Sequence, residues 1–440
     1  MNLVAWITDR RVGVLTFEPT GGLFSFQYDP EWKASPTAYP LSPALPLAPV
    51  EESPSWHSAR VRRFFENLLP EGKALEDAVA ANGLSKANLF GLMLALGRES
   101  AGAIALLPEN ESPTALPISQ RPIPFSELSE RIRQRGQVPF TVWDSKVRLS
   151  IAGLQDKLAV FQEESGAFAL AEGGLSSTHI LKPESLNEMI SHQVANEHYC
   201  MALANALGVT AAAAHIARVP EAILVVKRFD RFLQGKRVLR RHIIDSCQAL
   251  DMPVANKYER NFGNSAQVAD VRDGVSFAKL FGLAAKSTSE AATTLALLRW
   301  AIFQYLIGNS DAHGKNVSFF LGAGGLQIAP AYDLVAVCMY PHLDQQLAMA
   351  IGDDFVLDDI GAFSWAVFAS ECGLDRHLVG RQMRRLAQAA IISAPAVRAS
   401  HEYSEEERAF LNDLEEKILG QAARLLRDAK LLPTISDADL

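Results

Sequence analysis

Short apolar segments mark the start of the chain as β-rich. Turn residues separate three strand-like segments, at 3–7, 12–17 and 23–28, which are built from β-branched and aromatic residues. A proline-rich stretch follows from Pro36 to Pro54. Helical spacing of apolar residues then predicts helices over 59–69, 73–82 and 86–96. The apolar residues at 103–107 predict one further strand.

The middle of the chain is also rich in predicted strands. Residues 108–124 contain Pro108, Pro113, Pro117, Pro122 and Pro124 and predict the first linker. A helix is predicted at 127–135, and strands are predicted at 148–151, 158–162, 178–181 and 222–226. One amphipathic helix, over about 186–207, interrupts these strands, and Gly208 can end it.

After Phe232 the pattern becomes mostly helical. Helices are predicted over 276–285, 289–307, 363–371, 376–390 and 405–427. The exception is a predicted hairpin, with strands at 316–321 and 326–328 around a turn at 322–325. A β-rich half therefore precedes a helical half.

Composition narrows the class of protein. The chain has 440 residues, of which 48% are hydrophobic and 21% charged, as in a soluble globular protein. Its net charge of −8 argues against a basic nucleic-acid-binding coat, so any DNA role needs a local patch or a basic partner. We expect no membrane span, no secretion signal and a cytoplasmic protein. Four cysteines without CxxC spacing indicate reduced thiols rather than disulfides or zinc ligands.

The most informative residues flank the predicted hairpin. Asp311 and Asn316 stand five apart before it, and Asp333 follows after it. Phosphoryl transfer from ATP needs a carboxylate that accepts the proton of the attacking hydroxyl and oxygen ligands that hold Mg²⁺ against the phosphates. Asp and Asn often only cap loops, and each residue alone is better explained that way. Their combined order and spacing favours a kinase catalytic loop with its metal ligands.

The β-rich half offers the remaining parts of a kinase. Lys182 ends a predicted strand and suits pairing with a phosphate, although a surface lysine there is equally ordinary. Glu197, in the next helix, is a candidate ion-pair partner. Residues 150–157 form a candidate phosphate loop, but with one glycine they are no Walker A motif. Residues 226–231 fall where a kinase has its hinge; backbone groups there and Phe229 are candidate adenine contacts, and a charged surface turn is the alternative.

These stretches together resemble the HipA family, the serine/threonine kinase toxins of bacterial toxin–antitoxin pairs. The resemblance rests on residues 148–157, Lys182, 228–231, and 310–316 with Tyr332-Asp333. Residues 245–248 and 257–259 also resemble the family, as do residues 64–70 and 97–103 near the start. The resemblance implies an α+β, two-lobed kinase-like fold with an extra N-terminal domain. We expect that domain at 1–112, the kinase N-lobe at 113–228 and a helical C-lobe at 229–440.

The resemblance also implies roles for individual residues. Asp311 would be the catalytic base, Asn316 and Asp333 would hold Mg²⁺, and Ser150 would be an autophosphorylation site that silences the kinase. ATP would be bound by a larger set: Ala152, Gly153, Leu154, Gln155, Asp156, Lys157, Lys182, Lys227, Arg228, Phe229, His313, Lys315 and Tyr332.

Partners follow from the same resemblance. We expect a HipB-like helix-turn-helix antitoxin, contact with operator DNA through that antitoxin, and a protein substrate such as an aminoacyl-tRNA synthetase. Two alternatives remain open. One is a small-molecule kinase with the same catalytic groups, and the other is a catalytically weak corepressor module. The retention of Asp311, Asn316, Asp333 and Lys182 together argues against the second.

Overall fold

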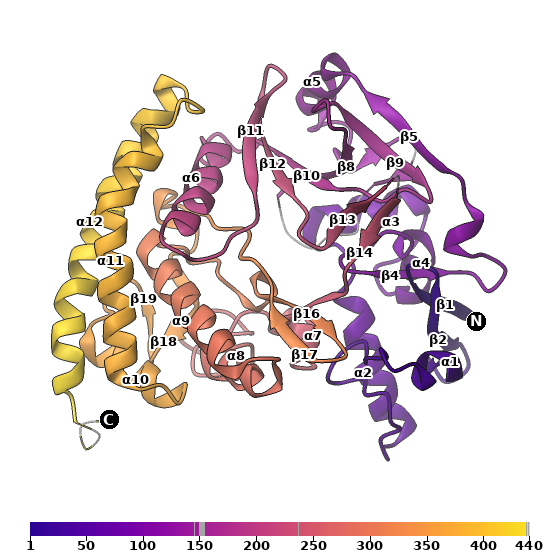
Figure 1. Ribbon diagram of the computed structural model, residues 1–440, viewed down its shortest axis with the longest axis horizontal. Coiled ribbons are helices and arrows are strands. Elements are labelled where there is room, and N and C mark those ends of the chain that lie inside the picture. Colours follow the sequence, from indigo (N-terminus) through magenta and orange to yellow (C-terminus); the bar gives the residue numbers. More distant parts are fainter. Residues whose placement is uncertain (145, 149–154, 236, 437, 439) are drawn as a thin grey trace. The chain divides into compact units, whose positions relative to one another are not determined.

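The computed structural model describes all residues except 145, 149–154, 236, 437 and 439 (Figure 1). The described chain forms two compact units. Unit 1 contains Met1–Glu184, Ala217–Val254 and Phe319–Gly325; unit 2 contains Ser185–Ile216, Ala255–Ser318 and Leu326–Leu440. Each unit therefore joins segments that lie far apart in the sequence.

Unit 1 begins with a four-stranded antiparallel sheet in the order β3-β2-β1-β4. The strands are β1 (Asn2–Ile7), β2 (Arg10–Glu18), β3 (Leu23–Tyr28) and β4 (Ile104–Leu107), which confirms the four predicted strands. The helices between β3 and β4 are α1 (Pro30–Ala34), α2 (Pro54–Glu66), α3 (Gly72–Asn82) and α4 (Leu89–Leu96). Alternation in β3 buries Phe26, whose ring lies 5.8 Å from that of Phe65 in α2. This contact holds α2 against the sheet.

A second, six-stranded sheet has the order β11-β12-β10-β8-β9-β5. Its strands are β5 (Ile118–Ile123), β8 (Leu158–Gln162), β9 (Phe168–Gly173), β10 (His179–Pro183), β11 (Ala214–Arg218) and β12 (Ala222–Lys227). The chain crosses from unit 2 to unit 1 within β11. Strand β10 pairs antiparallel with both β12 and β8, and Lys182 stands opposite Leu224 of β12. Lys182 is therefore carried by an inner strand.

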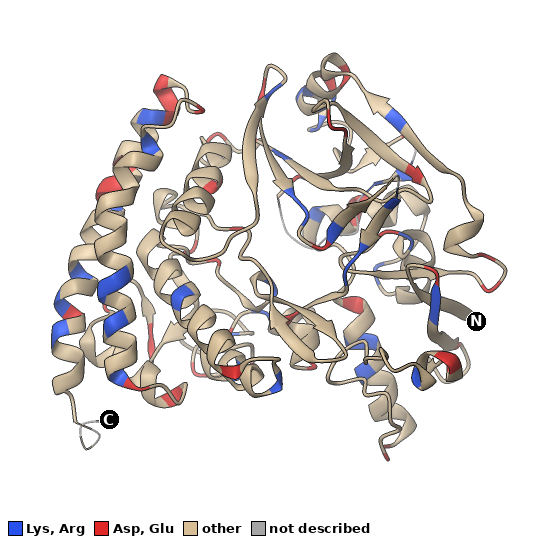
Figure 2. Ribbon diagram, in the orientation of Figure 1, with Lys and Arg blue, Asp and Glu red and all other residues tan. Residues whose placement is uncertain are grey.

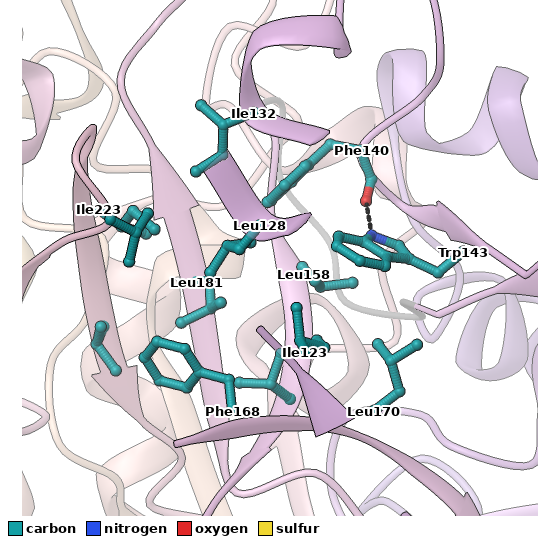
Figure 3. Close-up of a cluster of buried hydrophobic side chains, with 13 residues drawn as sticks. Ile123, Leu128, Ile132, Phe140, Trp143, Leu158, Phe168, Leu170, Leu181 and Ile223 are labelled. Atoms are coloured by element: carbon teal, nitrogen blue, oxygen red, sulfur yellow. Dashed lines mark hydrogen bonds between the residues drawn. The ribbon is translucent and has the colours of Figure 1, made fainter. Parts of the chain in front are cut away.

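The apolar core of this sheet packs against helix α5 (Phe125–Gln134) (Figure 3). Leu128 and Ile132 of α5 meet sheet residues such as Leu158 and Leu181. Full burial of a leucine contributes about 1.5–3 kcal/mol, so this cluster holds the sheet and α5 together. Trp143, in the small pair β6 (Val142–Trp143) and β7 (Lys146–Val147), donates its indole N–H to the Phe140 carbonyl at 2.8 Å.

The predicted linker at 108–124 is only partly correct. Residues Ile118–Ile123 form β5, which pairs in register with β9. Proline cannot donate a ladder hydrogen bond, but β5 is the last strand in the sheet order, and an edge strand tolerates Pro122. The many prolines therefore led to the prediction of a linker where part of the segment forms a strand.

The remaining strands of unit 1 lie after β12. Strands β13 (Arg231–Gln234) and β14 (Arg237–Arg240) form a hairpin that the sequence did not predict, and β15 (Ile243–Asp245) precedes helix α7 (Ser246–Ala249). The predicted later hairpin is confirmed as β16 (Ser318–Gly322) and β17 (Gly325–Ile328). It extends β15 into a three-stranded sheet, within which the chain crosses between the units.

Unit 2 is mostly helical, as predicted. Its helices are α6 (Gln193–Ala206), α8 (Phe277–Gly282), α9 (Glu290–Ile307), α10 (Ala362–Glu371), α11 (Arg376–Arg398) and α12 (Glu405–Leu431). The predicted helix at 186–207 begins only at Gln193, because His192 has a φ of 57°, outside the helical region. Strands β18 (Gln346–Ile351) and β19 (Asp354–Val356) were not predicted.

The last helix, predicted over 405–427, buries one stripe of apolar residues. Leu411, Leu414, Ile418 and Leu425 are fully buried, so the stripe is core. The acidic first turn of α12 is coloured red in Figure 2, and the Ser404–Glu407 capping box begins the helix. Among the described residues, no helix is long and apolar enough to cross a membrane.

Candidate active site

The predicted catalytic loop begins where α9 ends. Gly308 follows the helix with a φ of 62°, and its N–H bonds the carbonyls of Gln304 and Tyr305. A side chain here would place its Cβ 2.6 Å from the Cys338 Sγ. Glycine is therefore required at this position both by backbone conformation and by the close approach of Cys338.

Two buried residues fix the backbone beside Asp311. The Asn309 amide donates to Gln304 Oε1 at 2.9 Å, and its Oδ1 accepts from the Asp311 N–H at 3.1 Å. The Ser310 hydroxyl donates to the Asp344 carbonyl at 2.7 Å, and the Ser310 carbonyl accepts from Ala348 N–H of β18 at 2.8 Å. Asp311 itself is exposed. A rigid loop thus presents an accessible carboxylate, which is the geometry that a general base requires.

The two predicted metal ligands are brought together by the hairpin. The Asn316 Nδ2 donates to Asp333 Oδ2 at 3.3 Å, although the residues are 17 apart in sequence. The Tyr332 hydroxyl lies 2.5 Å from the Lys315 carbonyl and 2.7 Å from the Ser318 hydroxyl, which ties the two ends of the hairpin. Asp333 has a φ of 57°, a conformation that a non-glycine residue adopts only when its surroundings hold it.

This pair fits a magnesium site. Asn316 is buried, and its Oδ1 has no hydrogen-bond partner among the residues that the structure describes. An uncompensated amide oxygen beside a carboxylate is a donor set that Mg²⁺ accepts, since it binds one or two protein oxygens and completes its shell with phosphate and water. Within the described part of the chain, no cluster of three His, Cys, Asp or Glu side chains suggests another metal site.

His313 lies in the same loop and is neutral at physiological pH. Burial, with a smaller contribution from the positive charge of Lys257, lowers the pKa of His313 to about 3. The adjacent Gly314 donates its N–H to the Lys257 carbonyl at 2.9 Å, and a Cβ at Gly314 would lie 2.6 Å from a Val275 methyl group. Lys315 is also buried. The loop therefore packs too closely to rearrange freely.

Unit 1 holds the predicted phosphate-binding lysines. Lys182 and Lys157 are 6% and 4% exposed. Lysine is almost never fully buried without a partner for its charge, so neither is an ordinary surface lysine. The alternative of a surface lysine after a strand is wrong for Lys182. Glu197, expected as its partner, is also buried, on α6 in unit 2.

The described end of the predicted phosphate loop is tied to its own unit. Asp156 forms an ion pair with Arg135 at 3.5 Å, and the Gln155 amide donates to the Pro183 carbonyl at 3.4 Å. The Asp156 carboxylate is therefore held by a cation of the fold. Ser150, Ala152, Gly153 and Leu154 lie outside the described residues, so their predicted roles stay predictions.

The predicted hinge is not a charged surface turn. Lys227 is exposed, but Arg228, Asp230 and Arg231 are each 4% exposed. Asp230 accepts hydrogen bonds from both arginines and from the Gly102 N–H, and Phe229 packs its ring 5.9 Å from that of Phe320. The Arg228 side chain is therefore already engaged in a buried network that stabilises the fold. This network was not predicted from the sequence. The opposite charges of Arg228, Asp230 and Arg231, close together in the chain, were the signal that could have indicated it.

Comparisons with known proteins identify the family of the chain. A HipA N-terminal domain model matches residues 3–107, and a HipA-like C-terminal domain model matches residues 149–394. The chain belongs to the HipA family. HipA-family membership makes it a protein serine/threonine kinase of the toxin class, with the α+β kinase-like fold predicted from the sequence.

Individual HipA relatives cover nearly all of the chain. The serine/threonine-protein kinase toxin HipA of Shewanella oneidensis is 42% identical over 97% of this chain and 96% of its own length. A putative kinase of Sinorhizobium fredii, Y4mE, is 32% identical over 96% of this chain and 97% of its own length. A solved Shewanella oneidensis MR-1 complex of HipA, HipB and operator DNA matches with a TM-score of 0.88 and 40% identity, covering 99% of this chain and all of that one. The three-domain division predicted from sequence stays a prediction.

Proposed function

We propose that this HipA-family chain transfers the γ-phosphate of ATP to serine or threonine hydroxyls of a protein, with Mg²⁺ as cofactor. The observation that carries the proposal lies in unit 2, where the loop after α9 presents Asp311 and Asn316 is held against Asp333. A kinase requires this set of groups, and loop capping does not require all three together.

Each residue has a definite task in this proposal. Asp311 accepts the proton of the attacking hydroxyl and orients its oxygen. Asn316 and Asp333 hold Mg²⁺, which when bound supplies the positive charge that offsets the phosphate oxygens. Lys182, Lys157 and the residues at 152–156 contact the phosphates, and Lys227, Arg228 and Phe229 lie along the adenine. His313, Lys315 and Tyr332 line the nucleotide side of the loop. Because Arg228 has its side chain in an ion network, its contribution to adenine binding is through the backbone.

The partners we propose follow those of the solved HipA–HipB–DNA complex. A helix-turn-helix antitoxin would bind this chain and carry it to operator DNA. The net charge of −8 suits an indirect contact with DNA through a basic partner. We further propose a translation-related substrate such as an aminoacyl-tRNA synthetase, a cytoplasmic site of action, and self-inactivation by phosphorylation of Ser150. Phosphate at Ser150 would add about −1.5 to −2 charges, which would compete with ATP for the phosphate loop.

The decisive experiment is phosphate transfer by Asp311→Asn. Purified protein, treated with phosphatase beforehand, is incubated with γ-labelled ATP, Mg²⁺ and a cell lysate. Removing the base should lower transfer to protein by roughly 10²–10⁴-fold while leaving thermal stability unchanged. Wild-type transfer by Asp311→Asn would exclude Asp311 as the base. Label that enters small metabolites instead of protein would favour the small-molecule kinase. A wild type that transfers no label but binds the antitoxin would favour the corepressor.

The metal ligands have their own test. Asn316→Ala and Asp333→Ala should each weaken Mg²⁺–ATP binding in calorimetric titrations, because each removes an oxygen that completes the metal shell. Unchanged affinity together with unchanged turnover in both variants would show that these residues do not hold the metal. Asn412→Ala, on the exposed side of α12, is a matched control for the loss of an amide.

A further inference from the structure

Tyr258 contacts the proposed base directly. Its hydroxyl donates to Asp311 Oδ1 at 2.6 Å, within the range of charge-assisted O–H···O⁻ bonds. Its ring meets the His313 ring edge-on at 5.1 Å, and the Lys257 ammonium lies 5.3 Å from its centroid. One tyrosine thus contacts both Asp311 and His313 of the catalytic loop. Tyr258 lies 53 residues before Asp311 in sequence.

The backbone around Tyr258 is fixed to the same loop. On one side, the Lys257 carbonyl accepts from Gly314 N–H at 2.9 Å. On the other side, Glu259 bonds the Ala348 carbonyl through its N–H and the Ala350 N–H through its carboxylate, at 2.9 and 2.8 Å. Arg272 completes the support, with its Nε 2.7 Å from the buried Glu259 carboxylate.

Strand β18 is bonded to both the segment that carries Tyr258 and the segment that carries Asp311. It bonds Glu259 through residues 348 and 350, and its Ala348 N–H bonds the Ser310 carbonyl next to Asp311. The Tyr258 backbone is also crowded, because a Cβ at Gly274 would lie 1.7 Å from the Tyr258 carbonyl oxygen. The tyrosine therefore cannot shift without moving β18 or the catalytic loop. The Tyr258 hydroxyl is thus held within hydrogen-bonding distance of the Asp311 carboxylate.

We propose that Tyr258 is a positioning residue for Asp311. The loop backbone fixes the Asp311 Cα, but an exposed aspartate side chain would still sample several rotamers. The Tyr258 hydroxyl selects one of them, so that a fixed carboxylate meets the incoming substrate hydroxyl. This proposal rests on the proposed role of Asp311 as the base. It predicts an effect on the chemical step and little effect on nucleotide binding, since the contact is to the base.

Tyr258→Phe tests the hydroxyl and keeps the ring that packs on His313. The maximal rate of label transfer from γ-labelled ATP to lysate protein should fall about 10- to 100-fold, the range expected for a hydrogen bond to a charged group. The KM for ATP should stay within about twofold, and the melting temperature should hardly change. Tyr28→Phe is the matched control. It removes a hydroxyl of unit 1 that bonds the Leu45 carbonyl and the Leu41 N–H, so it should lower the melting temperature and leave the transfer rate unchanged.

The outcomes separate the two proposals. If Asp311→Asn is inactive while Tyr258→Phe keeps the wild-type maximal rate, the positioning role is wrong and Asp311 can still be the base. A faster Tyr258→Phe would also overturn it, because the tyrosine would then be blocking the base. A rise in the KM for ATP without a fall in maximal rate would assign Tyr258 to nucleotide binding instead. If Asp311→Asn keeps wild-type transfer, or the wild type has none, both proposals fail.

Discussion

Replacing Asp230 by alanine should be among the most destabilising single substitutions in unit 1. The Asp230 side chain is 5% exposed, and those of Arg228 and Arg231 are 2% and 1% exposed. The carboxylate accepts from Arg228 at 3.0 and 2.8 Å, from Arg231 at 2.6 Å and from the Gly102 N–H at 2.8 Å. The two guanidiniums, by compensating for burial, hold the pKa of Asp230 well below its usual range.

The cost follows from what remains after the carboxylate is removed. The two buried guanidiniums would then be left with the carboxylate of Glu99, which is 28% exposed and 3.8 Å from Arg228. Leaving buried charges without their partner costs about 3–5 kcal/mol. For a unit of this size, that corresponds to a fall in melting temperature of roughly 6–20 °C. Because Arg231 also bonds the carbonyls of Ser100 and Gly102, the loss should loosen the segment before β4 from the hairpin β13–β14.

Calorimetric or fluorescence melting of the full chain measures the effect, with Glu76→Ala as the control. Glu76 also lies in unit 1 and pairs with Lys86 at 2.8 Å, but both side chains are more than half exposed, so its loss should hardly matter. Adding Arg231→Met to Asp230→Ala should restore part of the stability, because it removes one of the unpaired charges. A melting temperature for Asp230→Ala as high as that of Glu76→Ala would refute the reasoning.

Two further predictions concern a buried histidine and a glycine. Burial lowers the pKa of His242 to about 4, against about 6.5 when unfolded, so the unfolded state binds the extra proton; stability is complete above about pH 6.5 and falls by up to about 3 kcal/mol towards pH 4. Urea unfolding of His242→Gln should show a shallower acid limb than the wild type, and parallel curves would contradict this. Gly308→Ala should reduce both stability and phosphate transfer, through a strained φ costing about 1–3 kcal/mol and the clash with Cys338. Gly83→Ala has a similar φ of 61° and open space, so equal losses of stability in both variants would exclude the clash.

Local sequence patterns determined much of this protein. Short runs of β-branched and aromatic residues between turn residues identified β1, β2 and β3. Two apolar runs around a glycine-rich turn identified the hairpin β16–β17. Helical spacing identified α9 and α12 within a few residues. The spacing of Asp311, Asn316 and Asp333 indicated a phosphotransfer site, because a hairpin of that length returns the chain to its start. The N- and C-terminal HipA resemblance, read from short motifs, was confirmed by the family models.

Tertiary structure alone decided the features that depend on distant partners. Whether Arg228 and Asp230 face solvent or a buried network depends on Gly102, more than a hundred residues away. The local sequence pattern around Asp230 contains no information about that contact. The proline in β5 is tolerated because β5 lies at the sheet edge, a property of the strand order. Helix α6 begins late because His192 leaves the helical region. Tyr258 meets Asp311 because β18 holds both segments, so the sequence could supply the two residues but only the packed fold could set them 2.6 Å apart.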